Sequence, residues 1–119
     1  MKIMVVNDVE LNCKLISWML ESAKHSIVAA DSGLEALELV AENTPDLVFM
    51  NTKMPDMDGF QTSRLIRQIP SCKYIPIIFL LTTLDQATLS EYPTPGADDI
   101  LNIPINDHQL LEKIRKYSA

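Results

Sequence analysis

Five short apolar runs alternate with stretches of helical apolar spacing, and this alternation limits the possible folds of the 119-residue chain more than any other feature. Continuous apolar runs are typical of strands buried on both faces of a parallel sheet. Strand-then-helix repeats place helices over those two faces. The sequence therefore predicts one α/β domain over residues 1–119. The expected strands are Ile3–Val6, Ile27–Ala30, Leu47–Met50, Ile75–Leu81 and Ile100–Ile103.

Apolar residues between these runs predict which helix faces pack on the sheet. Leu11, Leu15, Trp18 and Met19 fit one face, so we expect Trp18 in the core or at its edge rather than as an aromatic that binds a partner. The other predicted faces are Leu34, Leu37 and Ala41; Leu65 and Ile69; and Leu110 and Ile114.

Helix boundaries have their own signals. A capping-box pattern marks three starts, at Ser32-x-x-Glu35 and, in looser form, at Asp58-x-x-Gln61 and Asn106-x-x-Gln109. A fourth helical stretch, from Asp85 to about Tyr92, is short because the prolines that follow it stop a helix.

Composition excludes several classes of protein. Ten Lys and Arg against 16 Asp and Glu give a net charge of −6, which argues against a surface that binds nucleic acid. No apolar run approaches the ~20 residues of a membrane span, and the N-terminus lacks the apolar core of a signal peptide. Cys13 and Cys72 lack metal or disulfide spacing, which predicts reduced thiols in a cytoplasmic protein.

Two motifs carry a family resemblance. The first follows the third predicted strand and reads Met54-Pro55-x-Met57-Asp58-Gly59, and the second, Gly96-Ala97-Asp98-Asp99, precedes the last strand. Over essentially the whole chain, this pattern resembles the receiver domain of two-component response regulators. The resemblance implies a flavodoxin-like (βα)₅ three-layer sandwich with a five-stranded parallel sheet of order 2-1-3-4-5. The functional crevice of such a sheet lies beyond the carboxyl ends of its strands.

The resemblance also implies a phosphoryl-transfer site. In active members an aspartate at the end of the third strand accepts a phosphoryl group from a histidine kinase. That aspartate and two acids after the first strand hold Mg²⁺, which neutralises charge during the transfer. A Thr or Ser after the fourth strand and a Lys after the fifth hold the phosphoryl oxygens.

This sequence departs from the family pattern at the acceptor and at the acidic pair. Asn51 occupies the acceptor position, and Asn7 and Asp8 occupy the pair. An amide has neither a nucleophilic carboxylate oxygen nor the charge that holds a cation. Asp8 is thus the one remaining candidate metal ligand, and we expect no catalytic residue, metal or cofactor.

The other positions depart as well. Leu81 falls at the Thr or Ser position, unless a one-residue slip brings Thr82 there. Ile103 falls at the Lys position and Ile100 at the aromatic switch position. Lys53, in the loop after the third strand, could place an ammonium near the acceptor position.

These losses together indicate a pseudo-receiver: a non-enzymatic signalling module, not phosphorylated at Asn51, that acts through protein–protein contacts. The alternative is a conventional Mg²⁺-dependent receiver in which an engineered or natural change put Asn at position 51. A nucleotide or flavin binder is disfavoured because no Gly-rich phosphate loop is present.

The resemblance implies partners of two kinds, a histidine kinase or an output domain, at the surface formed by the fourth helix, fifth strand and fifth helix. Residues 74–112 of this surface contain six acids and no Lys or Arg, which predicts a basic partner whose binding weakens with salt.

Overall fold

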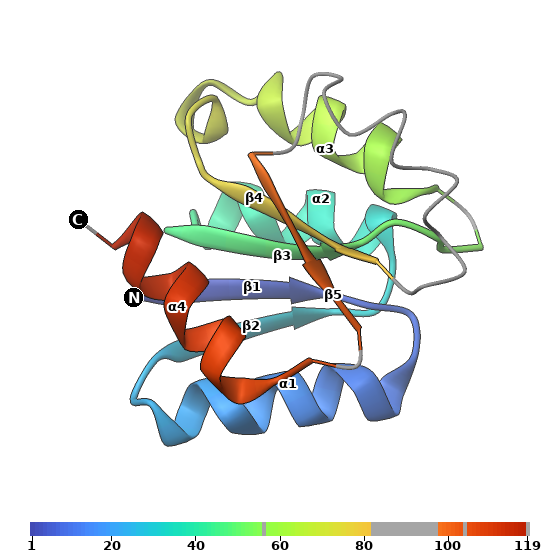
Figure 1. Cartoon of the computed structure of the whole chain (residues 1–119). Coiled ribbons are helices and arrows are strands. Elements are labelled where there is room, and N and C mark those ends of the chain that lie inside the picture. Colours follow the sequence, from blue (N-terminus) through green and yellow to red (C-terminus); the bar gives the residue numbers. More distant parts are fainter. Residues whose placement is uncertain (56, 82–97, 104, 119) are drawn as a thin grey trace.

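The computed structural model describes residues 1–55, 57–81, 98–103 and 105–118. They form a parallel sheet of five strands in the order β2-β1-β3-β4-β5 (Figure 1), which confirms the expected fold class. The predicted helix from Asp85 to Tyr92 lies outside the described residues. The elements are β1 (Lys2–Val6), α1 (Glu10–Ser22), β2 (Ser26–Ala30), α2 (Gly33–Glu42), β3 (Leu47–Asn51), α3 (Gly59–Arg67), the 3₁₀ turn η1 (Pro70–Cys72), β4 (Ile77–Leu81), β5 (Asp99–Asn102) and α4 (Asp107–Tyr117).

The strand register aligns the carboxyl-terminal ends of the strands at one end of the sheet. Val6 of β1 pairs with Ala30 of β2 and with Met50 of β3. Further along the sheet, Asn51 of β3 pairs with Leu80 of β4. The residues that follow β1, β2 and β3 therefore leave the sheet side by side.

Successive side chains of each strand pack on opposite faces of the sheet. One core cluster joins alternate strand residues to α2 and α3, and includes an edge-to-face contact of Phe60 with Phe79 at 4.8 Å between ring centroids. The other cluster joins the remaining strand residues to α1 and α4 (Figure 1). All five residues of β4 are buried, as the continuous apolar run predicts for a central strand covered on both faces.

The predicted face of α1 was wrong for three of its four residues, while the fourth, Met19, is partly buried and packs against the core. The buried residues of the helix are Ile16 and Leu20, whereas Leu11, Leu15 and Trp18 are 65%, 46% and 68% exposed. The helix has apolar residues on two opposite sides, and both sets have helical spacing. Spacing alone could not decide which side meets the sheet.

A similar shift occurs in α2 and α3. Of the predicted residues, Leu37 and Ile69 are partly buried against the core, whereas Leu34, Ala41 and Leu65 are exposed. The neighbouring faces that contain Ala36 and Ile66 are buried. The buried faces combine small residues such as Ala36 with large ones such as Phe60 and Ile66, so residue size was a poor guide to burial. In α4 the predicted Leu110 and Ile114 are both buried, which confirms that face.

The three predicted helix starts are confirmed. Asp58 and Gln61 form a complete capping box at α3. Ser32 caps α2 by accepting from the Glu35 backbone N–H, but the Glu35 carboxylate accepts from the Asp31 N–H rather than from the cap residue. Asn106 caps α4 by accepting from two backbone N–H groups of the first turn.

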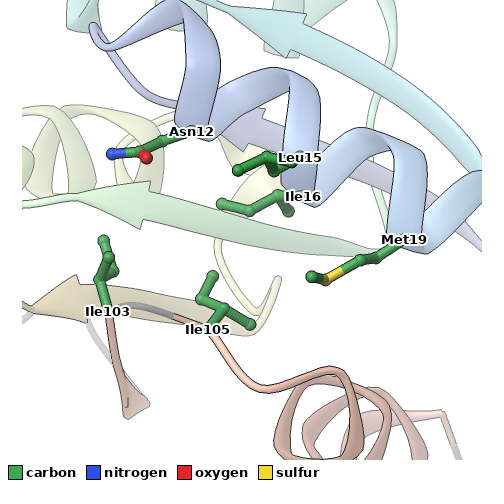
Figure 2. Close-up of a pocket in the computed structure, with 6 residues that line it drawn as sticks. All are labelled: Asn12, Leu15, Ile16, Met19, Ile103 and Ile105. Atoms are coloured by element: carbon green, nitrogen blue, oxygen red, sulfur yellow. The ribbon is translucent and has the colours of Figure 1, made fainter.

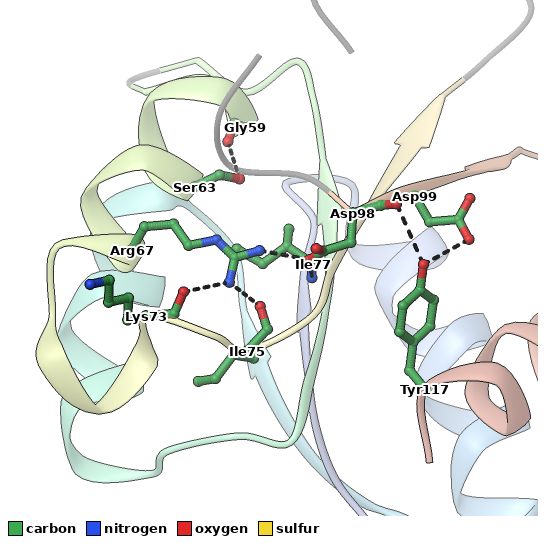
Figure 3. A network of polar contacts seen from close by, with 9 residues as sticks. All are labelled: Gly59, Ser63, Arg67, Lys73, Ile75, Ile77, Asp98, Asp99 and Tyr117. Carbon is green, nitrogen blue, oxygen red and sulfur yellow. Dashed lines mark hydrogen bonds and ion pairs between the residues drawn. The ribbon is translucent and has the colours of Figure 1, made fainter. Parts of the chain in front are cut away.

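Asp98 connects the start of β5 to α3 and β4. Its Oδ2 accepts hydrogen bonds from Arg67 Nη2 at 2.7 Å and from the Ile77 N–H at 2.9 Å (Figure 3). Arg67 also donates Nη1 to the carbonyl oxygens of Lys73 and Ile75. The guanidinium thus holds the end of α3 against the chain that enters β4.

Asp99 connects β5 to α4. Its largely buried Oδ2 accepts from Lys113 Nζ at 2.9 Å, from the Tyr117 hydroxyl at 3.0 Å and from Lys116 Nζ at 3.1 Å. Burial on its own raises the pKa of this carboxyl, but hydrogen bonds from Lys113, the Ile100 N–H, Lys116 and Tyr117 outweigh it and lower the pKa to about 2.

We predict that Asp99→Asn destabilises the protein in a pH-dependent way. The folded pKa lies below the ordinary 3.8, so the contribution of the carboxylate is present above about pH 4 and is lost as the pH falls toward 2. At neutral pH the variant should lose about 2 kcal/mol of unfolding free energy, measured by urea denaturation. The control is Glu38→Gln on the exposed side of α2. An equal loss for Asp99→Asn at pH 3 and pH 7 would contradict this assignment.

We also predict that Gly59→Ala destabilises the fold. A Cβ at Gly59 would lie 2.4 Å from the Asn51 carbonyl oxygen and 2.9 Å from Thr52 Cα, and no side-chain movement relieves either contact. Alanine is normally the better helix residue by up to ~1 kcal/mol, so the steric clash reverses the usual sign, and we expect a loss of about 2 kcal/mol. Thermal and urea unfolding measure this loss. Ala41→Gly, on the exposed side of α2, is the control with ordinary preference; a gain of stability in Gly59→Ala would contradict the packing described.

Candidate functional site

The candidate site is formed by residues at the carboxyl ends of β1 and β3. Asn51 is the last residue of β3, and Asp8 follows β1 by two residues. Asn51 Nδ2 donates one hydrogen bond to Asp8 Oδ1 at 2.9 Å and another to the Lys53 carbonyl oxygen at 3.1 Å. The structure therefore brings together three of the predicted site residues.

The Asn51 amide determines what this cluster can bind. An amide nitrogen has two N–H donors and no acceptor lone pair, and both contacts of Asn51 Nδ2 are to oxygens. Mg²⁺ binds oxygen ligands, usually one or two carboxylates with waters and phosphate oxygens, so a cation here would compete with Asn51 Nδ2 for the Asp8 oxygen. Here one carboxylate is present, and a hydrogen-bond donor lies between it and the carbonyl. The donor set does not fit a divalent cation.

No other cluster supplies a metal site in the described part of the chain. Over residues 1–55, 57–81, 98–103 and 105–118, no group of three His, Cys, Asp or Glu side chains is placed to hold a metal ion. The nearest accumulation of acids is a hollow of about 450 Å³ beside Asp8. Its lining residues are Asn7, Asp8, Glu10, Cys13, Lys14, Ala29, Ala30, Asp31 and Glu35.

The thiol at this hollow, Cys13, has a raised pKa. Burial raises the pKa of Cys13, a hydrogen bond with Ser17 offsets part of the rise, and the carboxylates of Asp31 and Glu35 add to it. A thiol with a raised pKa is a poor nucleophile and metal ligand at neutral pH because little thiolate is present.

Asn7 is buried, and its side chain accepts a hydrogen bond from the backbone. It is 1% exposed, and its Oδ1 accepts from the Val9 N–H at 2.9 Å, which shapes the turn into α1. Its Nδ2 has no hydrogen-bond partner among the described residues. Asparagine preserves the turn that an aspartate would make, but it supplies no charge to the site.

Thr52 follows the third strand, where the sequence places the functional crevice, but the sequence assigns it no role. Its side chain is 1% exposed and its hydroxyl, like Asn7 Nδ2, has no partner in the part of the chain that the structure describes. Buried polar groups without partners cost roughly 1–3 kcal/mol each, so they are uncommon away from functional sites. Nothing in the sequence pattern distinguishes Thr52 from an ordinary loop residue.

The loop after β3 is held by packing. Met54 is buried, Pro55 is exposed, and Asp58 caps α3. Gly59 donates its N–H to the Thr52 carbonyl at 2.8 Å, which folds the loop back onto the end of β3. Lys53 is exposed and its carbonyl belongs to the Asn51 contact; the position of its ammonium near the site stays a prediction.

The positions predicted for gripping phosphoryl oxygens are apolar and packed. Leu81 is the buried last residue of β4, and Thr82 lies outside the described residues. Ile103 faces α1, where it lines a small groove with Leu15 (Figure 2). Ile100 packs partly against the cluster beneath α2 and α3. These three side chains offer neither hydroxyl nor ammonium.

Asp98 and Asp99 lie at the opposite end of the strands from Asn51, because Asp98 precedes β5 and Asp99 is its first residue, whereas Asn51 is the last residue of β3. They are bound to Arg67, Lys113 and Lys116 as described above. The second sequence motif is therefore structural in this chain. Its acids fix β5 and α4 and take no part in the candidate site.

Comparison with known proteins agrees with this geometry. The family model described as response regulator receiver domain matches residues 3–115. The chain is 33% identical to the response regulator PleD of Caulobacter vibrioides over 115 residues, which are 96% of this chain and 25% of PleD, so it spans about a quarter of that protein. It is 28% identical to the polar-differentiation response regulator DivK of Brucella ovis, covering 97% of this chain and 94% of DivK.

A solved structure shows the same architecture. The chemotaxis protein CheY4 of Vibrio cholerae superposes with a TM-score of 0.91 at 27% identity, covering 98% of this chain and 97% of CheY4. No helix in the described ranges is long and apolar enough to cross a bilayer. The motif after β3, the strand order and the family match over residues 3–115 all agree: the chain belongs to the response regulator receiver domain family.

Proposed function

We propose that this receiver domain signals without accepting a phosphoryl group at position 51 and acts through contacts with other proteins. The observation that carries the proposal is the pair of hydrogen bonds from Asn51 Nδ2 to Asp8 Oδ1 and to the Lys53 carbonyl oxygen. Receiver domains of two-component systems contact kinases and output domains, and we propose partners of these two kinds here. The domain is then a binding module rather than an enzyme.

The nucleophile is the first element that is missing. Phosphoryl transfer to a receiver forms an acyl phosphate, for which the acceptor must present a carboxylate oxygen. The Asn51 amide oxygen is uncharged and a weak nucleophile, and the amide nitrogen has no free lone pair. Among the described residues, the carboxylate in contact with Asn51 is that of Asp8, which lies in the loop after the neighbouring strand β1.

The electrostatic support is the second missing element. A cation at these strand ends would have to displace the hydrogen bonds that Asn51 Nδ2 donates to Asp8 Oδ1 and to the Lys53 carbonyl oxygen. Asn7 supplies no charge, and its oxygen is used by the turn into α1. The amide thus holds the ends of β1 and β3 together by hydrogen bonds, where a charged site would need a metal to offset repulsion between carboxylates.

The third missing element is the set of side chains that responds to phosphorylation. A receiver switches when a new phosphoryl group draws a hydroxyl and a basic side chain toward it, and an aromatic side chain follows. Leu81, Ile103 and Ile100 at these positions are apolar and already packed in the core or against α1. We infer that the domain is constitutive or is controlled by a bound partner.

The acidic segment 74–112 offers a partner less charge than its composition indicates. Asp98 pairs with Arg67, and Asp99 with Lys113 and Lys116, inside the domain. Asp107 and Glu112 are exposed on α4. Docking of a basic partner on this segment stays a prediction and rests on those two acids and on the residues outside the described ranges.

The alternative is a conventional receiver in which Asn51 replaced an aspartate. The intact packing around Gly59 and the retained Asp8 favour it, because the cradle of the site keeps its shape. The two proposals differ in what one substitution can restore. In a conventional receiver Asn51→Asp restores the full chemistry, whereas in the domain proposed here Leu81 and Ile103 still cannot hold phosphoryl oxygens.

We therefore predict different responses of the native chain and Asn51→Asp to Mg²⁺ and beryllofluoride, followed by amide NMR shifts at the ends of β1, β3 and β4. The native chain should not respond to either. Asn51→Asp places a second carboxylate beside Asp8, so it should lose about 1 kcal/mol of stability without metal and regain it with Mg²⁺. It should not form a stable beryllofluoride adduct.

The double variant Asn51→Asp, Asp8→Asn is the control for metal binding at this site, because it has a single carboxylate again and should ignore Mg²⁺. A native chain that shifts at the strand ends would contradict the proposal outright. A stable beryllofluoride adduct of Asn51→Asp would establish the conventional receiver instead.

A further inference from the structure

We propose that α1 is the interface of a homodimer, in which the helices of two copies of this chain pack antiparallel. The inference does not depend on the chemistry at position 51. Its starting point is a stripe of three apolar side chains, Leu11, Leu15 and Trp18, here called the α1 stripe. Each is largely exposed, on the side of α1 opposite the buried Ile16 and Leu20.

The spacing of the α1 stripe is that of a helix–helix seam. Its residues are separated by four and three positions, and Ser22 continues the pattern after four more. Alternating steps of four and three are the a and d positions of a heptad, which face a partner helix. An antiparallel pair of these helices has four layers of facing side chains. In the two inner layers Leu15 of one copy faces Trp18 of the other, and in the two outer layers Leu11 faces the small Ser22.

Charges beside the stripe select a second copy as the occupant. Lys14 and Glu21 are exposed and seven residues apart, so they occupy the same heptad position on one flank of the stripe. In an antiparallel pair this flank of one copy faces the same flank of the other copy. Lys14 of each copy then lies at the same height along the helix axis as Glu21 of the other. Two symmetric ion pairs result. A parallel pair would bring Lys14 toward the apolar Met19 instead.

The present partner of Lys14 does not oppose this arrangement. Lys14 Nζ lies 3.0 Å from Glu10 Oε1 within the same helix, and both side chains are more than two thirds exposed. Exposed i,i+4 pairs of this kind are weak, so Lys14 can exchange Glu10 for Glu21 of the second copy, or contact both, at little cost.

The other flank of the stripe offers room for the indole. A groove of about 110 Å³ lies between α1 and the chain that leads into α4 (Figure 2). Leu15, which faces Trp18 of the second copy, forms part of its wall. The groove residues are Asn12, Leu15, Ile16, Met19, Ile103 and Ile105. The edge of the indole of Trp18 can enter this groove and bury apolar surface on both sides.

The size of the interface sets its strength. A helix of 13 residues is about 20 Å long. Two such helices with their flanking groove bury less than the ~1,200 Å² at the lower limit of standard protein interfaces. We therefore expect a weak dimer whose population depends on protein concentration, rather than an obligate one.

Trp18 is the only tryptophan of the chain, so its fluorescence reports the interface directly. With increasing concentration, from micromolar to millimolar, we expect sedimentation velocity to show a monomer–dimer equilibrium and Trp18 emission to move to shorter wavelength. Leu15→Gln and Trp18→Ser should each weaken association by roughly a hundredfold. Both residues are exposed, and unchanged circular dichroism will show that these variants fold.

Charge reversal tests the geometry and the occupant together. Lys14→Glu and Glu21→Lys should each weaken the dimer by roughly tenfold, and the double variant should recover native affinity, because it restores both ion pairs with their signs exchanged. Glu38→Lys on α2 is the control for a change of net charge. A native chain that stays monomeric at millimolar concentration, a dimer indifferent to Trp18→Ser, or a double variant without recovery would each overturn the proposal. Monomeric behaviour with protection of α1 by a helix of another protein would assign the stripe to a different partner.

Discussion

Burial of the central strands on both faces is the constraint on which the rest of the structure depends. Within β3 and β4 neither face is open to water, so polar side chains can be accommodated only where the strands end. Parallel pairing then brings the ends of β1 and β3 together, and Asn51 comes into contact with Asp8. The position of the site is a consequence of the sheet, whereas its chemistry depends on the few side chains that occupy the edge.

Those side chains form a bridge rather than a binding site for a cation. The Asn51 amide satisfies two oxygens that a charged receiver would offer to a metal, and it does so without the repulsion that several carboxylates produce. Gly59 packs against β3, and hydrogen bonds from the Asn51 amide connect the ends of β1 and β3. Retained shape with reduced charge agrees with the binding module that we propose for this domain.

The strands could be predicted from the sequence because continuous apolar runs have few other uses in a domain of this size. The face of α1 could not, because Leu11, Leu15 and Trp18 have the same spacing as the residues that are buried, and only the neighbouring elements decide which side faces inward. The site residues Asn7, Asp8 and Asn51 followed from their positions after strands. The roles of the Lys53 carbonyl and of the buried Thr52 hydroxyl could not be predicted, because backbone acceptors and packing at a turn leave no pattern in the sequence.

If the Asn51 amide occupies the place of a cation, a crystal structure of the chain grown with excess Mg²⁺ will show it. Data to about 1.2 Å resolution would distinguish the amide nitrogen from its oxygen. We expect Asn51 Nδ2 within hydrogen-bond distance of Asp8 Oδ1 and of the Lys53 carbonyl oxygen, with no metal between them. A Mg²⁺ ion coordinated by Asp8 and that carbonyl, with Asn51 turned to offer its oxygen, would contradict it.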